Sequence, residues 1–328
     1  MRVWAARVCA WVCLLALVPV GSAMAATSVA NGSPGQGLEI SPPLEELSAN
    51  PGQTLTLNIM VRDVTSGELI ATAEADDFGA GSNELGQPQI LLNETGATRY
   101  SLKYWISPVG DFDLQPEQLR SVPITIKVPL NAEPGGHYGL VRFTAEPPNL
   151  KGTGVALSAS VGSLILLTVN GNITHKLSVV QFSVGQNNVK TGVFTDRNFF
   201  NNGPMDFLVR ISNSGTVHEQ PTGEIAVTDM LGTNITNVAV NEKMGNILPA
   251  SIRRFVQTLD KKALFGYFNA KLTMSYASGK TLTASLGFWV IPWKLVLIVI
   301  VVLVIVFFLL RLALRKYNEH IIAQARRR

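Results

Sequence analysis

The amino-acid sequence predicts an all-β protein with two β-sandwich domains in tandem, followed by a single transmembrane α-helix. Three observations predict this class. Short segments alternate apolar and polar residues, turn pairs such as Pro-Gly and Gly-Gly separate these segments, and one long apolar run lies near the C-terminus. An alternation with a period of two places one face of a strand in a core and the other in solvent. We find no amphipathic helix pattern before residue 288.

Residues 1–25 are predicted to be a secretory signal peptide. Two arginines precede an apolar segment over 8–20, and a small-x-small site follows at 23–25. This order predicts export and cleavage after Ala25. The alternative is an uncleaved first membrane helix, but the segment is short and is interrupted by Pro19 and Gly21, which favours cleavage.

The positions of the cysteines indicate that the exported domains are stabilised by their hydrophobic cores and not by disulfides. The two cysteines, Cys9 and Cys13, both lie in the signal peptide, so the mature chain has no thiol, disulfide or sulfur metal ligand. About 260 exported residues are enough for two domains of ordinary size. Surface domains of this kind in eukaryotes usually carry disulfides, so their absence favours a bacterial origin.

The first predicted domain covers 36–170. Gln53–Val64 and Val122–Val128 alternate most clearly, and their apolar residues are expected to face inward: Leu55, Leu57, Ile59, Val61, Val122, Ile124, Ile126 and Val128. Further strands are predicted over Leu69–Ala75, Tyr100–Ile106, His137–Thr144 and Val155–Val169. Turn signals lie between them, including Pro51-Gly52 and Pro134-Gly135-Gly136.

The second predicted domain covers 171–288. Its strands are predicted over Lys176–Val184, Met205–Ser212, Gly223–Met230, Arg253–Leu259, Tyr267–Ala277 and Thr281–Phe288. The segment 187–202 is rich in asparagine and is expected to be a polar loop. Short strands with frequent turns and no helices predict Ig-like β-sandwiches, so the architecture is two of these in tandem.

Residues 289–314 are predicted to be a transmembrane helix. Leu295–Leu310 is an unbroken apolar run of sixteen residues, which spans about 24 Å of a hydrocarbon core about 30 Å thick. The expected membrane anchors are interfacial tryptophans on one side and snorkelling or cytoplasmic cations, namely Trp289, Trp293, Lys294, Arg311, Arg315 and Lys316. The alternative is a buried core helix, but a helix buried in a soluble protein is not expected to be flanked by tryptophans on one side and a cluster of cations on the other.

The topology and the charge balance follow from these two ends. The Arg-rich tail, 315–328, is expected in the cytoplasm, and both sandwiches are expected outside a cell membrane that the chain crosses once. The exported part then carries 18 basic and 22 acidic residues, although the whole chain has a net charge of +4. A mildly acidic surface without a basic patch excludes a nucleic-acid partner.

A series of loose motifs resembles one family of surface proteins. In chain order they are Leu38–Pro43, Ala49–Gln53, Leu114–Pro116, Ala132–Gly139, Val161–Ile165, Asn213–His218, Pro221–Ile225 and Gly245–Arg253. Their order, followed by one membrane helix and a basic tail, resembles the WxL-interacting proteins of Gram-positive surfaces over 36–328. The resemblance implies that the first domain binds peptidoglycan and that the second binds a host or surface partner.

No catalytic or metal-binding constellation is visible in the sequence. The histidines are scattered without metal-ligand spacing, and no serine lies in a nucleophile elbow. Asp76-Asp77 and the pair Asp111 and Asp113 match no calcium loop, so they are expected to be solvated loop carboxylates. We therefore expect a protein that is not an enzyme and that needs no cofactor.

Tyr104, Trp105 and Phe112 are the candidate ligand-binding residues, because aromatic rings can stack on a sugar. One of Tyr104 and Trp105 is expected in the core whatever the function, since an alternating strand buries every second residue. Two functions follow. The first is a membrane-anchored, non-catalytic surface protein that binds cell-wall peptidoglycan or docks another surface or host protein. The second is a membrane-tethered chaperone or assembly factor for exported proteins that offers a strand edge.

Overall fold

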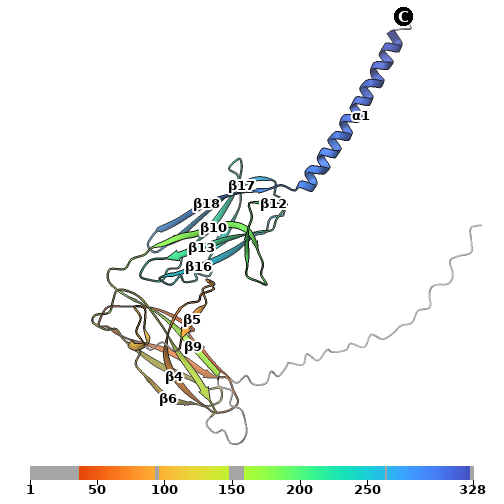
Figure 1. Cartoon of the computed structure of the whole chain (residues 1–328). Helices are drawn as coiled ribbons and strands as arrows, with labels where there is room; N and C mark the ends of the chain where they lie inside the picture. The colour runs from red at the N-terminus through yellow and green to blue at the C-terminus, as the bar shows by residue number, and fades with distance from the viewer. Residues whose placement is uncertain (1–36, 93–95, 148–158, 263, 326–328) are drawn as a thin grey trace, which may run out of the picture. The chain divides into compact units, whose positions relative to one another are not determined.

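The structure is a computed structural model that describes residues 37–92, 96–147, 159–262 and 264–325 (Figure 1). The predicted signal peptide lies outside these residues. The described chain is mostly strand, with one 3₁₀ helix and one long C-terminal helix. The predicted all-β class is confirmed, and the strands form two Ig-like sandwiches of two sheets each.

The first sandwich contains β1–β9. One sheet has the order β1-β3-β7, formed by β1 (Leu38–Ser41), β3 (Thr54–Asp63) and β7 (Leu119–Lys127). The other has the order β2-β9-β8-β4-β5, with β6 also paired to β4, and is formed by β2 (Leu44–Ala49), β9 (Ala159–Val169), β8 (Gly135–Glu146), β4 (Leu69–Ala80), β5 (Pro88–Leu91) and β6 (Val109–Leu114). The predicted inward residues of β3 and β7 line the core between the sheets; all are buried except Leu55, which is partly buried.

The N-terminal segment passes from one sheet to the other at Pro42-Pro43. β1 pairs antiparallel with β3, whereas β2 pairs parallel with β9. Proline has no N–H and cannot continue a ladder on both sides, so two prolines suit the crossing point. The crossing is held from β9, where the Ser163 hydroxyl donates to the Pro42 carbonyl at 2.7 Å and the Leu164 N–H donates to the Pro43 carbonyl at 3.0 Å.

The strand predicted over Tyr100–Ile106 is wrong. This segment contains a 3₁₀ helix, η1 (Lys103–Trp105). The reason is Asp77, whose Oδ1 accepts hydrogen bonds from the backbone N–H groups of Leu102 at 2.8 Å and Lys103 at 2.9 Å. These two donors are the first of a helical turn, and a carboxylate that binds both stabilises the turn over a strand.

The expectation that Asp76 and Asp77 are solvated loop residues is also wrong. The strand predicted to end at Ala75 continues to Ala80 as β4, and both carboxylates are buried. Asp77 caps η1, and Asp76 accepts a hydrogen bond from Arg142 Nε at 3.0 Å. Each therefore has a structural partner, as buried charges require.

The second sandwich contains β10–β18. One sheet has the order β11-β10-β13-β16, formed by β11 (Phe194–Asp196), β10 (Leu177–Asn187), β13 (Met205–Asn213) and β16 (Ser251–Leu259). The other has the order β12-β18-β17-β14-β15, formed by β12 (Phe199–Phe200), β18 (Lys280–Val290), β17 (Gly266–Tyr276), β14 (Thr222–Asp229) and β15 (Asn234–Val240). The predicted polar loop over 187–202 thus contains β11 and β12.

The C-terminal helix, α1 (Trp293–Ala325), follows β18 directly (Figure 1). β18 extends through Val290, so Trp289 is a strand residue and the helix begins four residues later than predicted. Residues Trp293–Asn318 are long and apolar enough to cross a membrane. At 1.5 Å per residue they measure about 39 Å, which exceeds a hydrocarbon core of about 30 Å.

Candidate functional site

The candidate site lies between two strands that are adjacent in sequence but belong to different sheets. β6 pairs with β4, and β7 pairs with β3. The two are joined by a tight turn in which the Gln118 N–H donates to the Gln115 carbonyl at 2.9 Å. Each of these strands forms its ladder along one edge only. The opposite edges of β6 and β7 face each other.

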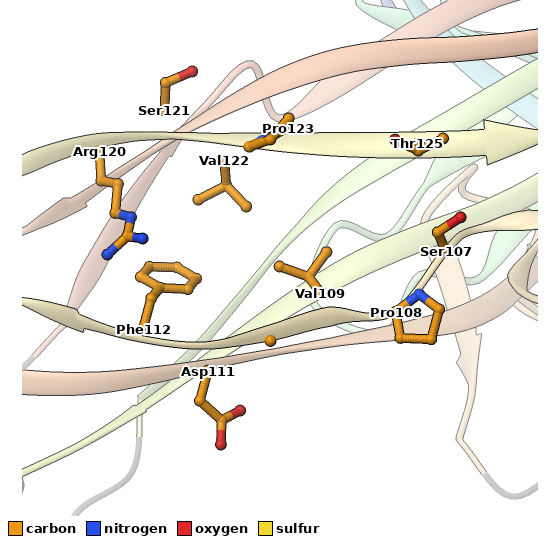
Figure 2. Close-up of a pocket in the computed structure, with 11 residues that line it drawn as sticks. Ser107, Pro108, Val109, Asp111, Phe112, Arg120, Ser121, Val122, Pro123 and Thr125 are labelled. Carbon is orange, nitrogen blue, oxygen red and sulfur yellow. The ribbon is translucent and has the colours of Figure 1, made fainter.

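The two strands meet at both ends and separate in the middle. Away from the turn, Ile106 and Ile126 form an isolated bridge, and the Ser107 N–H donates to the Thr125 carbonyl at 2.8 Å. Between these closures lies a cavity of about 270 Å³, which we call the β6–β7 groove (Figure 2). It is lined by Ser107–Phe112, Arg120–Pro123 and Thr125.

The groove is apolar inside and carries one cation. The side chains of Val109 and Val122 point into the space between the strands, whereas those of Asp111 and Ser121 point away from it (Figure 2). Arg120 lies over the Phe112 ring, with Cζ 4.7 Å from the ring centroid. A guanidinium at this distance is attracted to the face of an aromatic ring.

Two further contacts fix this end of the groove. Arg120 Nη1 donates to the Asp113 carbonyl at 3.3 Å, so the side chain links β7 to β6 across the gap. The buried Phe112 ring packs edge-on against Phe143, with centroids 6.3 Å apart. The floor of the groove is therefore part of the core, while the Arg120 side chain is exposed and can move without unfolding the sandwich.

The chemistry of the groove suits pairing rather than catalysis. Asp111 and Arg120 are its only titratable lining residues, and no lining side chain forms a nucleophile–base pair. The volume is below the range of about 300–1,000 Å³ typical of pockets for drug-sized ligands. Free strand edges, however, present backbone donors and acceptors to another chain. Among the described residues, no three His, Cys, Asp or Glu side chains are placed to hold a metal ion.

The three aromatic candidates do not form one exposed face. Phe112 lines the groove, but its ring is buried. Trp105 is partly buried against the core, and its ring centroid lies 4.2 Å from that of His137. Tyr104 is 54% exposed on η1. Stacking on a sugar by these residues therefore rests on Tyr104.

His137 is a buried structural residue. Its Nε2 lies 3.0 Å from the Glu133 carbonyl oxygen and its Nδ1 lies 3.3 Å from that of Ser101. Burial lowers the pKa of His137 below its usual value of 6.5, although both carbonyls favour the protonated ring. Because desolvation is the largest effect, the ring is neutral at pH 7.

The predicted membrane anchors lie at the end of β18 and along α1. Trp289 is on β18, and Trp293 and Lys294 begin the helix, with Lys294 Nζ 6.0 Å from the Trp293 ring centroid. The three remaining cations, Arg311, Arg315 and Lys316, are exposed on the helix beyond the apolar run.

Sequence reasoning did not find the groove. Val109 and Arg120 carry no motif, and β6 has glycine and aspartate where an alternating strand would show a pattern. One signal was available. Pro123 interrupts an otherwise alternating segment, and proline within a strand indicates an edge strand. β7 is indeed the edge of its sheet.

No protein-family model and no curated protein sequence matches this chain. Solved structures with a similar fold include the class 5 fimbriae chaperone CfaA, at 16% identity over 78% of this chain and 99% of that chain, with a TM-score of 0.37. A chain of the Salmonella enterica SafA pilin–SafB chaperone complex is 11% identical over 76% of this chain and 96% of its own, with a TM-score of 0.35.

A protein of unknown function from Porphyromonas gingivalis W83 is 12% identical over 76% of this chain and 98% of its own, with a TM-score of 0.31. At these identities and TM-scores, the similarities do not identify a function for this chain.

Proposed function

We propose that this protein is a membrane-anchored, non-catalytic binding module that pairs with an extended segment of another exported protein. The observation that carries the proposal is the β6–β7 groove, where two strand edges face each other across an apolar cavity. An incoming strand would bond to one edge through its backbone and place one apolar side chain between Val109 and Val122. This is recognition by strand addition, in which backbone bonds supply affinity and a pocket supplies selectivity.

This proposal favours the role of an assembly factor over that of a wall-binding protein. A cavity of about 270 Å³ can receive one side chain, so it selects weakly among sequences and suits chains that are still extended. A tether to the membrane would hold the groove near the place where exported chains emerge. Binding to peptidoglycan, which the resemblance to WxL-interacting proteins implies, needs exposed rings or polar groups for sugars, and only Tyr104 of the three aromatic candidates is well exposed.

Site-directed photo-crosslinking in cells tests the proposal. A photo-reactive residue at Ser121 is exposed beside the groove, and one at Lys127 is exposed on the same strand beyond the bridge at Ile126. We expect adducts with exported proteins from position 121 and few from position 127. Muropeptide adducts from position 121, or equal yields from both positions, would contradict strand addition at this site.

A filled groove provides the matched control. A Cβ atom added at Gly110, which lines the groove, or at Gly67, which does not, would meet no neighbouring heavy atom within 4 Å. Gly110→Trp adds an indole to a lining position without a clash at Cβ, and we expect it to obstruct an incoming strand and to reduce the adducts from position 121 at least tenfold. Gly67→Trp should leave them unchanged. In parallel, sedimentation with purified peptidoglycan should be the same for the wild type and for Gly110→Trp.

A further inference from the structure

Four large apolar side chains lie exposed at one end of the five-stranded sheet of the second sandwich, and three of them, Phe199, Trp289 and Tyr267, form a row across its outer face. The register pairs Phe199 of β12 with Trp289 of β18, and Trp289 with Tyr267 of β17. The rings of Tyr267 and Trp289 are in contact, with centroids 5.2 Å apart. Met230 follows the last registered residue of β14, Asp229, and its Cε lies 3.0 Å from where a Cβ on Gly266 would stand. We call these four residues the apolar row.

The apolar row is exposed to solvent, where polar side chains are more usual. The exposed fractions are 60% for Phe199, 42% for Trp289, 36% for Tyr267 and 63% for Met230. Two loop residues extend the surface, Leu231 at 85% and Phe265 at 68% exposed. Exposed apolar patches of this kind mark sites of interaction with another protein or with a membrane.

The covalent chain places the apolar row next to the predicted membrane helix. The sheet continues to Ile291, whose N–H donates to the Phe200 carbonyl at 2.8 Å. β18 ends at Val290 and helix α1 begins at Trp293, so only Ile291 and Pro292 lie between the strand and the helix. The apolar run begins at Leu295, six positions after Trp289, and even a fully extended chain covers only about 20 Å over six residue steps.

We propose that the apolar row, with Leu231 and Phe265, docks on the surface of the lipid bilayer that α1 crosses. The headgroup layer on each side of the hydrocarbon core is about 5–8 Å thick, and tryptophan and tyrosine partition there because one part of each ring system is apolar and another is polar. The inference rests on α1 spanning the membrane, but it does not depend on the β6–β7 groove.

Charge in the same region fits a lipid surface. Lys261 and Lys262 are exposed in the loop that also carries Phe265. Cations beside inserted apolar residues are the combination by which proteins bind anionic headgroups. A protein partner would not require cations beside the apolar residues, whereas a bilayer is two linking residues away from β18 whenever α1 is inserted.

Fluorescence of the full chain in lipid nanodiscs tests the inference. The two cysteines of the sequence, Cys9 and Cys13, are replaced by serine, so single cysteines can be introduced elsewhere without background. We would place an environment-sensitive dye at Phe199, at Leu231 and, as a control, at Thr273. Thr273 lies on β17, exposed on the same face as Tyr267 but six residues away, which is about 20 Å along the strand.

In discs of phosphatidylcholine and phosphatidylglycerol that hold one chain each, we expect blue-shifted emission at Phe199→Cys and Leu231→Cys. Quenching by aqueous iodide should be at least threefold weaker there than at Thr273→Cys. Equal quenching at all three positions would overturn the proposal. So would protection that appears only in discs with several chains, because a second copy would then cover the row.

A second experiment changes residues of the apolar surface while the dye is attached at a different position. With the dye at Phe265→Cys, the double change Leu231→Asp and Met230→Asp should raise iodide quenching to the level of the Thr273 control. Both residues are exposed, so circular dichroism of the sandwich should not change. Unaltered protection at Phe265→Cys would show that lipid contact with the row does not exist. Chains that fail to enter discs would instead refute the membrane crossing of α1.

Discussion

Ile124 is fully buried between the two sheets of the first sandwich. Ile124→Asp places an unpaired carboxylate there, and burying such a charge costs several kcal/mol against a total stability of about 5–15 kcal/mol. We expect this variant to leave the first sandwich unfolded. Leu57→Asp should do the same, because Leu57 on β3 is the ladder partner of Ile124. Limited proteolysis measures this, with Ser121→Asp as the control because Ser121 is exposed on the same strand. A protease-resistant Ile124→Asp protein would contradict the assigned core.

We expect His137 to make the first sandwich sensitive to mild acid. Its pKa is lowered in the folded state, chiefly by burial, so the unfolded state binds the proton more tightly. The stability that the neutral ring contributes is fully present above the unfolded pKa of about 6.5 and is lost as the pH falls toward the lower folded pKa. One such proton changes the free energy of unfolding by at most about 1.4 kcal/mol per pH unit.

Urea unfolding of the wild type and of His137→Gln between pH 8 and pH 5 checks this expectation. The wild type should lose stability more steeply below pH 6.5 than the variant. Parallel pH profiles would show that His137 does not control the acid response. If the variant fails to fold, a direct NMR titration of the His137 ring in the wild type gives the folded pKa.

At the scale of the element, one of the two hydrogen bonds that hold the crossing of the N-terminal segment between the sheets comes from a side-chain hydroxyl. Ser163 is fully buried and donates to the Pro42 carbonyl at 2.7 Å. Ser163→Ala leaves this partly buried carbonyl without that donor, and the loss of one such hydrogen bond costs about 0.5–1.5 kcal/mol. We expect a lower urea midpoint for the first sandwich. Ser160→Ala on the same strand removes an exposed hydroxyl and should change stability by less than about 0.5 kcal/mol.

The same scale shows what the sequence could and could not predict. Alternation located β3 and β7 because one face of each is buried and the other is solvated. It failed at η1, since the Asp77 carboxylate that stabilises this turn is 25 residues away in sequence from Leu102. It failed at β12 because two residues carry no period. The groove was out of reach for a related reason: it depends on which sheets β6 and β7 join, and that is a matter of long-range pairing.

At the scale of the whole molecule, the predicted topology is open to a direct test. With both sandwiches outside and the basic tail inside, protease added to intact cells should digest the sandwiches and leave a short C-terminal fragment that contains α1. The apolar run of the helix and the cations that follow it are the physical reason. An epitope tag after Arg328 makes the fragment visible on a blot. A full-length chain that resists protease would show that the topology is inverted or that the chain is not exported.

The two-residue link between β18 and α1, Ile291-Pro292, also determines how the molecule bears load. Tension between a bound partner and the membrane would enter the second sandwich at the end of β18, without a slack linker to absorb it. β18 is paired along eleven residues with β17, and β12 holds its other edge at Phe199 and Phe200. A pull along β18 shears these ladders, so their bonds must yield together rather than one after another. If α1 spans the membrane as predicted, the second sandwich would therefore resist such a pull through all of these ladder bonds at once.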